Sequence, residues 1–259
     1  MIDRSPYLVG NWKMHKGAKE SREFFRQLLG SPPTLSPALS HIWIAPPFTS
    51  IASAVESTRG SAIHIGAQNV SEHEEGAHTG EISLSMLWES GVTFVIVGHS
   101  ERRNEFHEDS LVVHRKVIRA LKGGMRVILC IGEQEEDYTQ GKTWEVLSQQ
   151  LNTGLGSLSY EVVKELLLIA YEPVWAIGSG QVATPDLVEG IHQRCRAFLQ
   201  KKWGKPSALI PMLYGGSVGP HNLRSLLSQP HVDGVLIGGA SLVVESFKKM
   251  IQSANEGGG

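Results

Sequence analysis

Cysteine is scarce in this sequence: Cys130 and Cys195 are the only two among 259 residues. Neither belongs to a C-x-x-C pair, which excludes a disulfide framework and favours a reducing, cytoplasmic setting. Long apolar runs are also missing. The longest is residues 166–171, far short of the roughly 18 residues that a membrane helix needs. The first six residues do not show the basic-then-apolar pattern of a secretory signal. We therefore expect no membrane partner.

Neither sign of charge dominates the composition. The chain has 24 basic and 26 acidic side chains, a formal net charge of −2. This balance produces no broad field that would draw the chain onto nucleic acid or anionic lipid. Hydrophobic residues make up 41% and charged residues 19%, a composition too apolar for a disordered chain. The composition thus predicts a globular protein that acts on a small molecule.

Short apolar, β-branched runs alternate along the chain with amphipathic stretches. The runs are mostly continuous, which is typical of strands buried on both faces. The expected strands are residues 7–10, 41–45, 62–66, 93–97, 126–131, 167–171, 209–214 and 234–237. Between them, apolar residues recur every three or four positions, which predicts helices that cover a sheet. The clearest helices are residues 18–29, 111–122, 144–155, 185–202 and 242–251, with a further helix opening at Pro220.

Eight strands alternating with helices predict a parallel α/β fold, either a doubly wound open sheet or a closed (β/α)₈ barrel. A barrel of eight units takes about 250 residues, and no linker-like stretch divides this chain. We therefore predict one (β/α)₈ barrel domain over residues 1–259. The last five residues, 255–259, are expected to fray as a tail.

Polar side chains and glycines follow several of the predicted strands. Reacting groups in a barrel stand at the C-terminal ends of the strands. The residues at these positions are Asn11, Lys13, His99, Ser100, Glu101, Glu172, 215–217 and 238–239. Each has an ordinary structural interpretation, as a surface lysine, a structural histidine, the end of a strand or a tight turn. Their convergence at one mouth instead predicts a site that can bind phosphate, abstract a proton and polarise a carbonyl.

Glycine turns after the last two strands indicate the kind of ligand. Glycine lets backbone N–H groups approach an anion closely, and a helix N-terminus adds partial positive charge. Residues 215–218 and 238–239 therefore predict a phosphorylated small molecule. Residues 173–180 form an apolar loop between a proline and glycines. This loop is either a packed connection or a lid that covers the site and excludes water.

Three motif matches fail in their context. Residues 178–183 match a dinucleotide pattern, but no acidic residue stands about 20 positions further on. Residues 215–219 match a nucleophile elbow, yet the last histidine, His231, precedes the candidate acid Asp233 in the chain. Residues 73–78 miss the H-E-x-x-H zinc spacing. No nucleotide cofactor, hydrolase triad or metal site is therefore expected.

Seven segments together resemble the triosephosphate isomerase family. They occur in the family's order and spacing across essentially the whole chain: residues 10–14, 66–70, 98–103, 130–133, 170–178, 214–218 and 238–242. The resemblance implies a TIM barrel that interconverts dihydroxyacetone phosphate and D-glyceraldehyde 3-phosphate through an enediolate. Proton transfer of this kind requires no metal and no organic cofactor.

The resemblance also implies roles for individual residues. Glu172 would be the base, neutral His99 the proton donor to the carbonyl oxygen, and Lys13 the cation beside the developing oxyanion. Glu101 and Ser100 would support these three. The substrate-binding residues would be Asn11, Lys13, Gly178, Ser217, Gly238 and Gly239. Residues 172–180 would form the closing lid.

Members of the family form dimers, so the resemblance also implies a homodimer. The loop Ser71–Glu81, with Thr79 at its tip, would insert into the partner near Asn11 and Lys13. The sequence departs from the family pattern at His78, where an aromatic residue is usual, and mildly at Ser179, where threonine is usual. Two alternatives stay open: a related sugar-phosphate isomerase, such as an erythrulose-phosphate isomerase, and a non-catalytic protein that binds a phosphorylated ligand on the same barrel.

Overall fold

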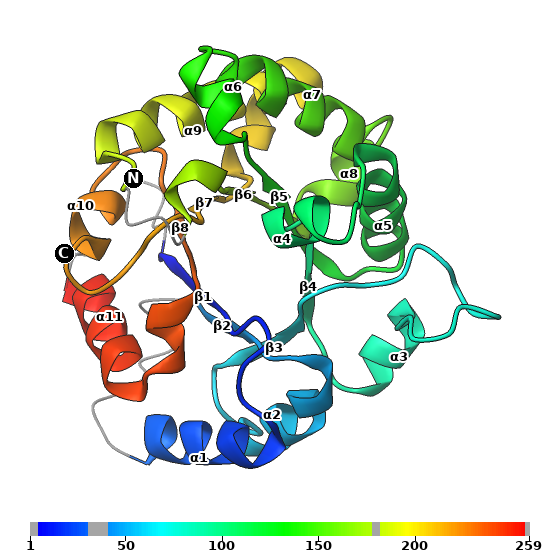
Figure 1. Cartoon of the computed structure of the whole chain (residues 1–259), viewed down its shortest axis with the longest axis vertical. Coiled ribbons are helices and arrows are strands. Elements are labelled where there is room, and N and C mark those ends of the chain that lie inside the picture. The colour runs from blue at the N-terminus through cyan, green and yellow to red at the C-terminus, as the bar shows by residue number, and fades with distance from the viewer. Residues whose placement is uncertain (1–4, 31–40, 178–181, 257–259) are drawn as a thin grey trace.

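Eight parallel strands close on themselves in chain order, each pairing with the next and β1 pairing with β8 (Figure 1). The computed structural model describes residues 5–30, 41–177 and 182–256. The strands are β1 (Tyr7–Asn11), β2 (His41–Ala45), β3 (His64–Ala67), β4 (Phe94–Val97), β5 (Arg126–Ile131), β6 (Leu167–Tyr171), β7 (Met212–Tyr214) and β8 (Gly234–Ile237). The register between β1 and β8 runs from Tyr7 opposite Gly234 to Gly10 opposite Ile237. This pairing confirms the (β/α)₈ barrel and excludes the open sheet.

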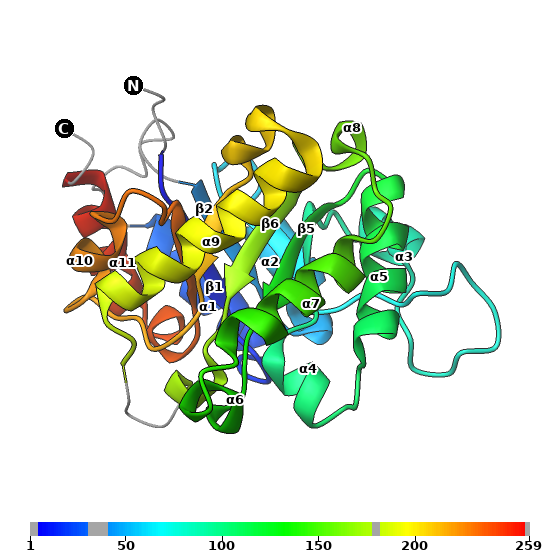
Figure 2. The ribbon, with the colours of Figure 1, turned by 90° about the horizontal axis from the view of Figure 1, so that it is seen from above.

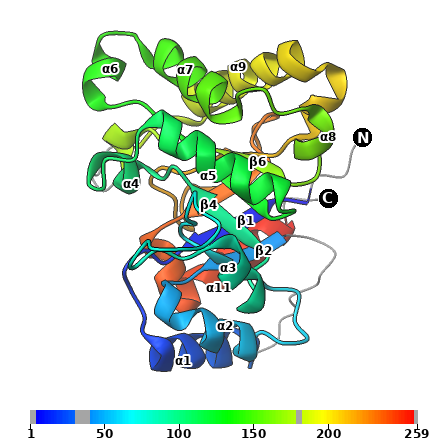
Figure 3. The ribbon, with the colours of Figure 1, turned by 90° about the vertical axis from the view of Figure 1, so that its right-hand side faces the viewer.

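Helices surround the strands as an outer layer (Figures 1 and 3). The α-helices are α1 (Ala18–Leu29), α2 (Ile51–Ser57), α3 (Leu84–Glu89), α4 (Ser100–Asn104), α5 (Ser110–Lys122), α6 (Glu135–Thr139), α7 (Thr143–Leu155), α8 (Tyr160–Val163), α9 (Pro185–Trp203), α10 (Leu223–Leu227) and α11 (Val244–Glu256). Short 3₁₀ helices occur at Phe48–Ser50, Val174–Ala176, Lys205–Leu209 and Gly239–Leu242. Helices α4 and α6 lie at one end of the barrel and α8 lies at the other (Figure 2).

The alternation of side chains along each strand divides the core into two parts. One set fills the barrel interior, and it includes Val9, Phe94, Ile128 and Leu213. The other set packs between the strands and the helices. Inside the barrel, the ring of Phe94 uses the space beside Gly66: a Cβ at position 66 would lie 2.3 Å from its Cζ. The barrel is therefore a filled core, and only its mouth is open for a ligand.

Four predicted strands have the observed bounds, but the strand expected at residues 209–214 covers only Met212–Tyr214. Two of the carbonyl groups before this strand bind a side chain, whereas the Pro211 carbonyl accepts a hydrogen bond from Ile169 N–H of β6. Arg196 on α9 donates to the carbonyl oxygens of Ala208 and Ile210. Pro211 in addition has no N–H to give to a strand. These residues therefore lie outside the sheet.

The helix expected to open at Pro220 begins at Leu223, with Asn222 as its N-cap. The Asn222 side chain accepts a hydrogen bond from Gly219 N–H and donates to the Ser217 carbonyl, which keeps Pro220 in the turn before the helix.

At the C-terminus, the tail expected from residue 255 begins within the last helix. Asn255 and Glu256 complete α11, because Ile251 and Ala254 in the same helix are buried against the barrel. Residues 257–259 lie outside the described residues.

Candidate active site

A cavity of about 300 Å³ opens where the carboxyl ends of β1, β4, β6, β7 and β8 meet. The predicted lysine, imidazole and carboxylate all line it. Its lining residues are Asn11, Lys13, His99, Glu172, Ile177, Gly215, Gly216, Ser217, Val218, Leu236, Gly238, Gly239 and Ala240. The structure therefore brings together residues that are up to 229 positions apart in the sequence, from Asn11 to Ala240.

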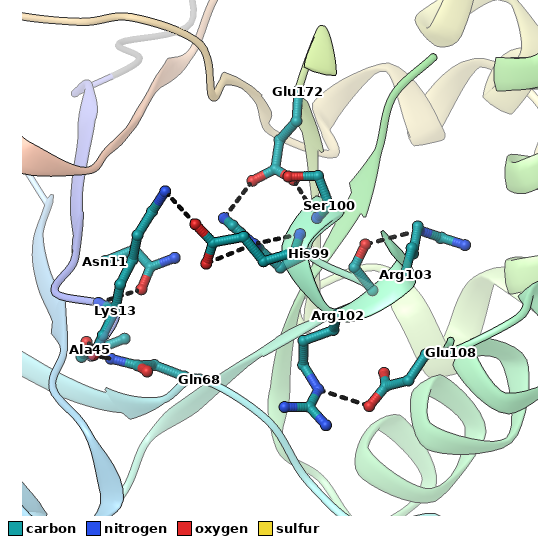
Figure 4. Close-up of polar contacts among 12 residues, drawn as sticks. Asn11, Lys13, Ala45, Gln68, His99, Ser100, Arg102, Arg103, Glu108 and Glu172 are labelled. Atoms are coloured by element: carbon teal, nitrogen blue, oxygen red, sulfur yellow. Dashed lines mark hydrogen bonds and ion pairs between the residues drawn. The ribbon is translucent and has the colours of Figure 1, made fainter. Parts of the chain in front are cut away.

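Lys13 stands just after β1 in an unusual backbone conformation, with a φ of 51°. Two side chains stabilise this turn. Asn11 Oδ1 accepts a hydrogen bond of 3.0 Å from Lys13 N–H, and Gln68 Nε2 donates at 2.9 Å to the Lys13 carbonyl. Gln68 also donates at 2.9 Å to the Ala45 carbonyl, so it ties the ends of β1 and β2 together (Figure 4). The Lys13 ammonium lies 2.6 Å from Oε1 of Glu101.

His99 follows β4 and serves as the N-cap of α4. Its Nδ1 accepts a hydrogen bond of 3.2 Å from Glu101 N–H. A ring nitrogen that accepts a hydrogen bond carries no proton, so this geometry assigns the proton of the neutral imidazole to Nε2. That Nε2 lies 3.2 Å from Oε1 of Glu172 and lines the cavity (Figure 4).

Glu172 follows β6 and is 1% exposed. Its Oε2 accepts a hydrogen bond of 3.0 Å from Ser100 N–H, whereas Oε1 has no hydrogen bond to any described residue. A glycine makes room for this carboxylate: a Cβ at Gly215 would lie 2.8 Å from Glu172 Cγ. The His99 imidazole and this buried Oε1 therefore face each other across the cavity.

The glycine-rich loops after β7 and β8 form the opposite wall of the cavity. Ser217, Gly238 and Gly239 lie there as expected from the sequence. The 3₁₀ helix Gly239–Leu242 begins at this wall. Gly178, also predicted to bind substrate, lies outside the described residues, as do residues 179–181 of the predicted lid.

The two residues expected to support the site, Ser100 and Glu101, both act through their backbone N–H groups, and Glu101 also acts through its side chain. Ser100 acts through its backbone N–H, which binds Glu172. Glu101 binds Lys13 with its carboxylate and His99 with its backbone N–H. Sequence reasoning assigned no role to Gln68, although it follows β3 and the same rule of strand ends would have selected it.

Glu133, which follows β5, is a second residue that the sequence analysis left without a role. Its Oε1 accepts hydrogen bonds from Trp175 Nε1 at 2.9 Å and Tyr171 OH at 3.1 Å. Burial raises the pKa of Glu133, and the hydrogen bond from Trp175 opposes this effect. The base of the predicted lid, the 3₁₀ helix Val174–Ala176, is therefore attached to the end of β5.

Two other features of the described residues bear on function. A larger cavity, about 750 Å³, lies on the flank between α3, α5 and residues 72–74, far from the barrel mouth. Its acidic groups Glu72 and Glu74 pair with Arg115 and Arg119. Within residues 5–30, 41–177 and 182–256, no cluster of three or more histidine, cysteine or acidic side chains could hold a metal. None of their helices is long and apolar enough to cross a membrane.

The fold and the cavity define a (β/α)₈-barrel protein in which a cation, an imidazole and a buried carboxylate converge beside glycine-rich loops. The family model for triosephosphate isomerase matches residues 6–254. Triosephosphate isomerase of Protochlamydia amoebophila is 44% identical over 256 residues, which cover 98% of this chain and 94% of that protein. Triosephosphate isomerase of Fusobacterium nucleatum is 46% identical over 249 residues, 96% of this chain and 98% of that protein.

A solved structure is similar throughout. The crystal structure of triosephosphate isomerase from Bartonella henselae matches with a TM-score of 0.85 and 34% identity, covering 97% of this chain and 99% of that one. The chain therefore belongs to the triosephosphate isomerase family, and it is an isomerase of triose phosphates.

Proposed function

We propose that Lys13, His99 and Glu172 interconvert dihydroxyacetone phosphate and D-glyceraldehyde 3-phosphate in the 300 Å³ cavity, with residues 1–259 acting as one barrel domain. The observation that carries the assignment is the pair of contacts around Glu172. One carboxylate oxygen is held by Ser100 N–H, and the other is buried and lies 3.2 Å from His99 Nε2. A base and an acid thus face one small space in which a single substrate can contact both.

Glu172 removes the proton from the carbon next to the carbonyl group. Its free oxygen, Oε1, is the atom available for this step, since Oε2 is engaged by Ser100. After the proton transfer, the same carboxyl group returns the proton to the neighbouring carbon. This movement exchanges the aldehyde and ketone positions without any other reactant.

His99 donates its Nε2 proton to the carbonyl oxygen as the enediolate forms, and then recovers it from the neighbouring oxygen. The Glu101 N–H bond to Nδ1 favours the tautomer that this step requires. A neutral imidazole suits the role because the enediolate oxygen, unlike the ground-state carbonyl, is basic enough to take its proton.

Lys13 supplies positive charge to the developing oxyanion and to the phosphate, with Asn11 beside it. Ser217, Gly238, Gly239 and Gly178 bind the phosphate through backbone N–H groups. Residues 172–180 form a lid that closes over the bound substrate, excludes water and protects the enediolate from losing phosphate. No metal or organic cofactor takes part.

The enzyme acts as a homodimer in the cytoplasm, with no nucleic acid or membrane partner. Support for the dimer comes from a smaller cavity of about 170 Å³ beside Lys13 and His99, bordered by Met14 and Phe106. These two apolar side chains are 93% and 61% exposed in the single chain. In the dimer, this cavity receives Thr79 from the partner's copy of the loop at residues 71–81, which projects from the body (Figure 1).

The loop at residues 71–81 has an aromatic contact of its own. The imidazole of His78 stacks on that of His73, with ring centroids 3.7 Å apart and planes inclined by 7°. The departure from the family pattern at His78 therefore keeps a planar ring, which packs within the same loop.

A coupled assay with D-glyceraldehyde 3-phosphate tests the role of Glu172. Glu172→Asp withdraws the carboxylate by about one methylene and should lower kcat roughly a hundredfold, because proton transfer depends on distances near 3 Å. Glu165→Asp makes the same change on an exposed residue before β6 and should leave the rate unchanged. Equal rates for Glu172→Asp and the wild type would refute the assignment of the base. Comparing kcat/KM for the triose and for erythrulose phosphate separates the triose isomerase from the related isomerase.

A further inference from the structure

Arg103, the fourth residue of α4, is a partly buried cation that the proposed mechanism does not use. Its Nε donates at 2.8 Å to the Gly98 carbonyl at the end of β4. Its Nη2 donates at 3.1 Å to the Cys130 carbonyl in β5. Both hydrogen bonds go to carbonyl oxygens, and no carboxylate of the described residues pairs with it.

The contacts of Arg103 differ from those of the neighbouring cations. Lys13 pairs with Glu101 at 2.6 Å and Arg102 pairs with Glu108 at 2.6 Å. Partial burial of a charge without such a partner costs solvation, and it lowers the pKa of Arg103, while Cys130, Glu172 and Glu108 oppose this change. The guanidinium stays charged at every working pH, because an arginine pKa is far above neutrality. Its positive charge is therefore permanent.

The local backbone is built to accommodate this side chain. Gly98 has a φ of +73°, which favours glycine, and a Cβ there would lie 2.9 Å from Nη2 of Arg103 and 3.0 Å from Cγ1 of Val113. A larger residue at position 98 would displace the guanidinium. Gly98 is therefore required both for the backbone turn and for the space that the Arg103 guanidinium occupies.

Arg103 and Glu172 line the same cavity of about 330 Å³, which lies behind the active-site cavity. The two residues are also linked through β5. Arg103 binds the Cys130 carbonyl, and the nearby charge of Glu172 adds to burial in raising the pKa of the Cys130 thiol. Ser100, which binds Oε2 of Glu172, stands one turn before Arg103 in α4. Arg103 is therefore bound to the strand that carries Cys130 and belongs to the same short helix as Ser100.

We propose that Arg103 is a positioning residue of the isomerase site. Its guanidinium joins the ends of β4 and β5 behind Glu172, and its positive charge attracts the Glu172 carboxylate. The charged and titratable groups around Glu172 are His99 after β4, Lys13 with Glu101 in front, and Cys130 and Arg103 behind. Among them, Arg103 is a cation with no carboxylate partner of its own, so its field acts on Glu172. This inference rests on the proposed role of Glu172 as the base.

Arg103→Met removes the charge and both hydrogen bonds while keeping a long side chain. We expect kcat at pH 7.5 to fall about tenfold, with KM changed less than about twofold because the phosphate loops are untouched. The acid limb of the kcat–pH profile should move up by about half to one pH unit, since loss of a nearby cation favours the protonated carboxyl group. Arg103→Lys keeps the charge but cannot reach both carbonyls, so its acid limb should stay near that of the wild type while kcat still falls.

Arg126→Met is the matched control. Arg126 begins β5 at the far end of the barrel, where its guanidinium lies 5.8 Å from the Trp43 ring centroid. Loss of stability alone lowers the melting temperature in either variant without moving the acid limb. An unshifted limb in Arg103→Met, or an equal shift in Arg126→Met, would overturn the proposal. If Arg103→Met does not fold, an unchanged kcat in Arg103→Lys would likewise overturn the proposal. Glu172→Asp distinguishes failure of this proposal from failure of the proposed function, because the variant would retain full activity if Glu172 were not the base.

Discussion

Glu101 contacts both Lys13 and His99, and it does so with different atoms. Its carboxylate Oε1 lies 2.6 Å from the Lys13 ammonium, and its backbone N–H donates at 3.2 Å to Nδ1 of His99. One residue at the start of α4 therefore holds the cation and the proton donor relative to each other. The carboxylate Oε2 also lies 3.6 Å from His99 Nδ1, but the backbone hydrogen bond to that atom does not depend on the side chain.

Glu101→Gln removes the charge that orients Lys13 and leaves the backbone contact to His99 in place. We expect kcat/KM to fall about ten- to hundredfold, because a displaced ammonium no longer matches the developing oxyanion. Steady-state kinetics measures this change. Glu105→Gln, on an exposed residue that follows α4, is the control and should retain wild-type kinetics. Wild-type values for Glu101→Gln would show that the ion pair has no part in catalysis.

Gly239→Ala tests the phosphate loops. No atom lies within 4 Å of the position of the new Cβ, so the empty protein accommodates the methyl group without strain. The same methyl group enters the cavity where the phosphate is proposed to bind. We expect KM to rise about tenfold with an unchanged melting temperature, and inorganic phosphate to inhibit the variant more weakly. A loss of stability with normal KM would contradict this assignment.

Protonation of buried histidine should make folding depend on pH. Burial lowers the pKa of His192 from 6.5 to about 4, so the folded protein binds fewer protons than the unfolded chain below pH 6.5. The free energy of unfolding therefore decreases as the pH falls through this range, by about 2 kcal/mol from pH 7 to pH 5 for this residue. Burial also lowers the pKa of His41 and His64, which adds in the same direction.

Urea denaturation at pH 7 and pH 5 measures this effect. His192→Gln should be less stable at pH 7, because it loses the fit of the ring beside Tyr171, but it should lose less stability on acidification. An identical pH dependence in the variant and the wild type would exclude His192 as the cause.

The proposed dimer predicts a specific effect of charge at Met14. Met14→Lys places an ammonium on a side chain that is 93% exposed in the single chain and buried in the dimer. Sedimentation velocity at micromolar concentration should show a dimer for the wild type and a monomer of lower activity for the variant. Leu209→Lys, on a 53% exposed side chain near the opposite end, should remain dimeric. A monomeric wild type would refute the dimer directly.

The sequence predicted the barrel well because most of its strands are continuous apolar runs between recognisable turns. Predictions failed where one residue far along the chain competes for the backbone, as Arg196 does for the carbonyl groups before β7. The same limit applies to the site. Lys13, His99 and Glu172 were selected because they follow predicted strands. The hydrogen bonds of Gln68 and Glu133 join residues that are far apart in the sequence, so their partners could not be identified before the structure was known.

Closure of β1 on β8 gives the sheet no free edge. A second molecule cannot extend this sheet by adding a strand while the barrel is intact, so the native protein is protected from that route to amyloid-like aggregation. Contact between folded copies must instead use side chains on loops and helices, which are easier to diversify during evolution than a hydrogen-bonded seam.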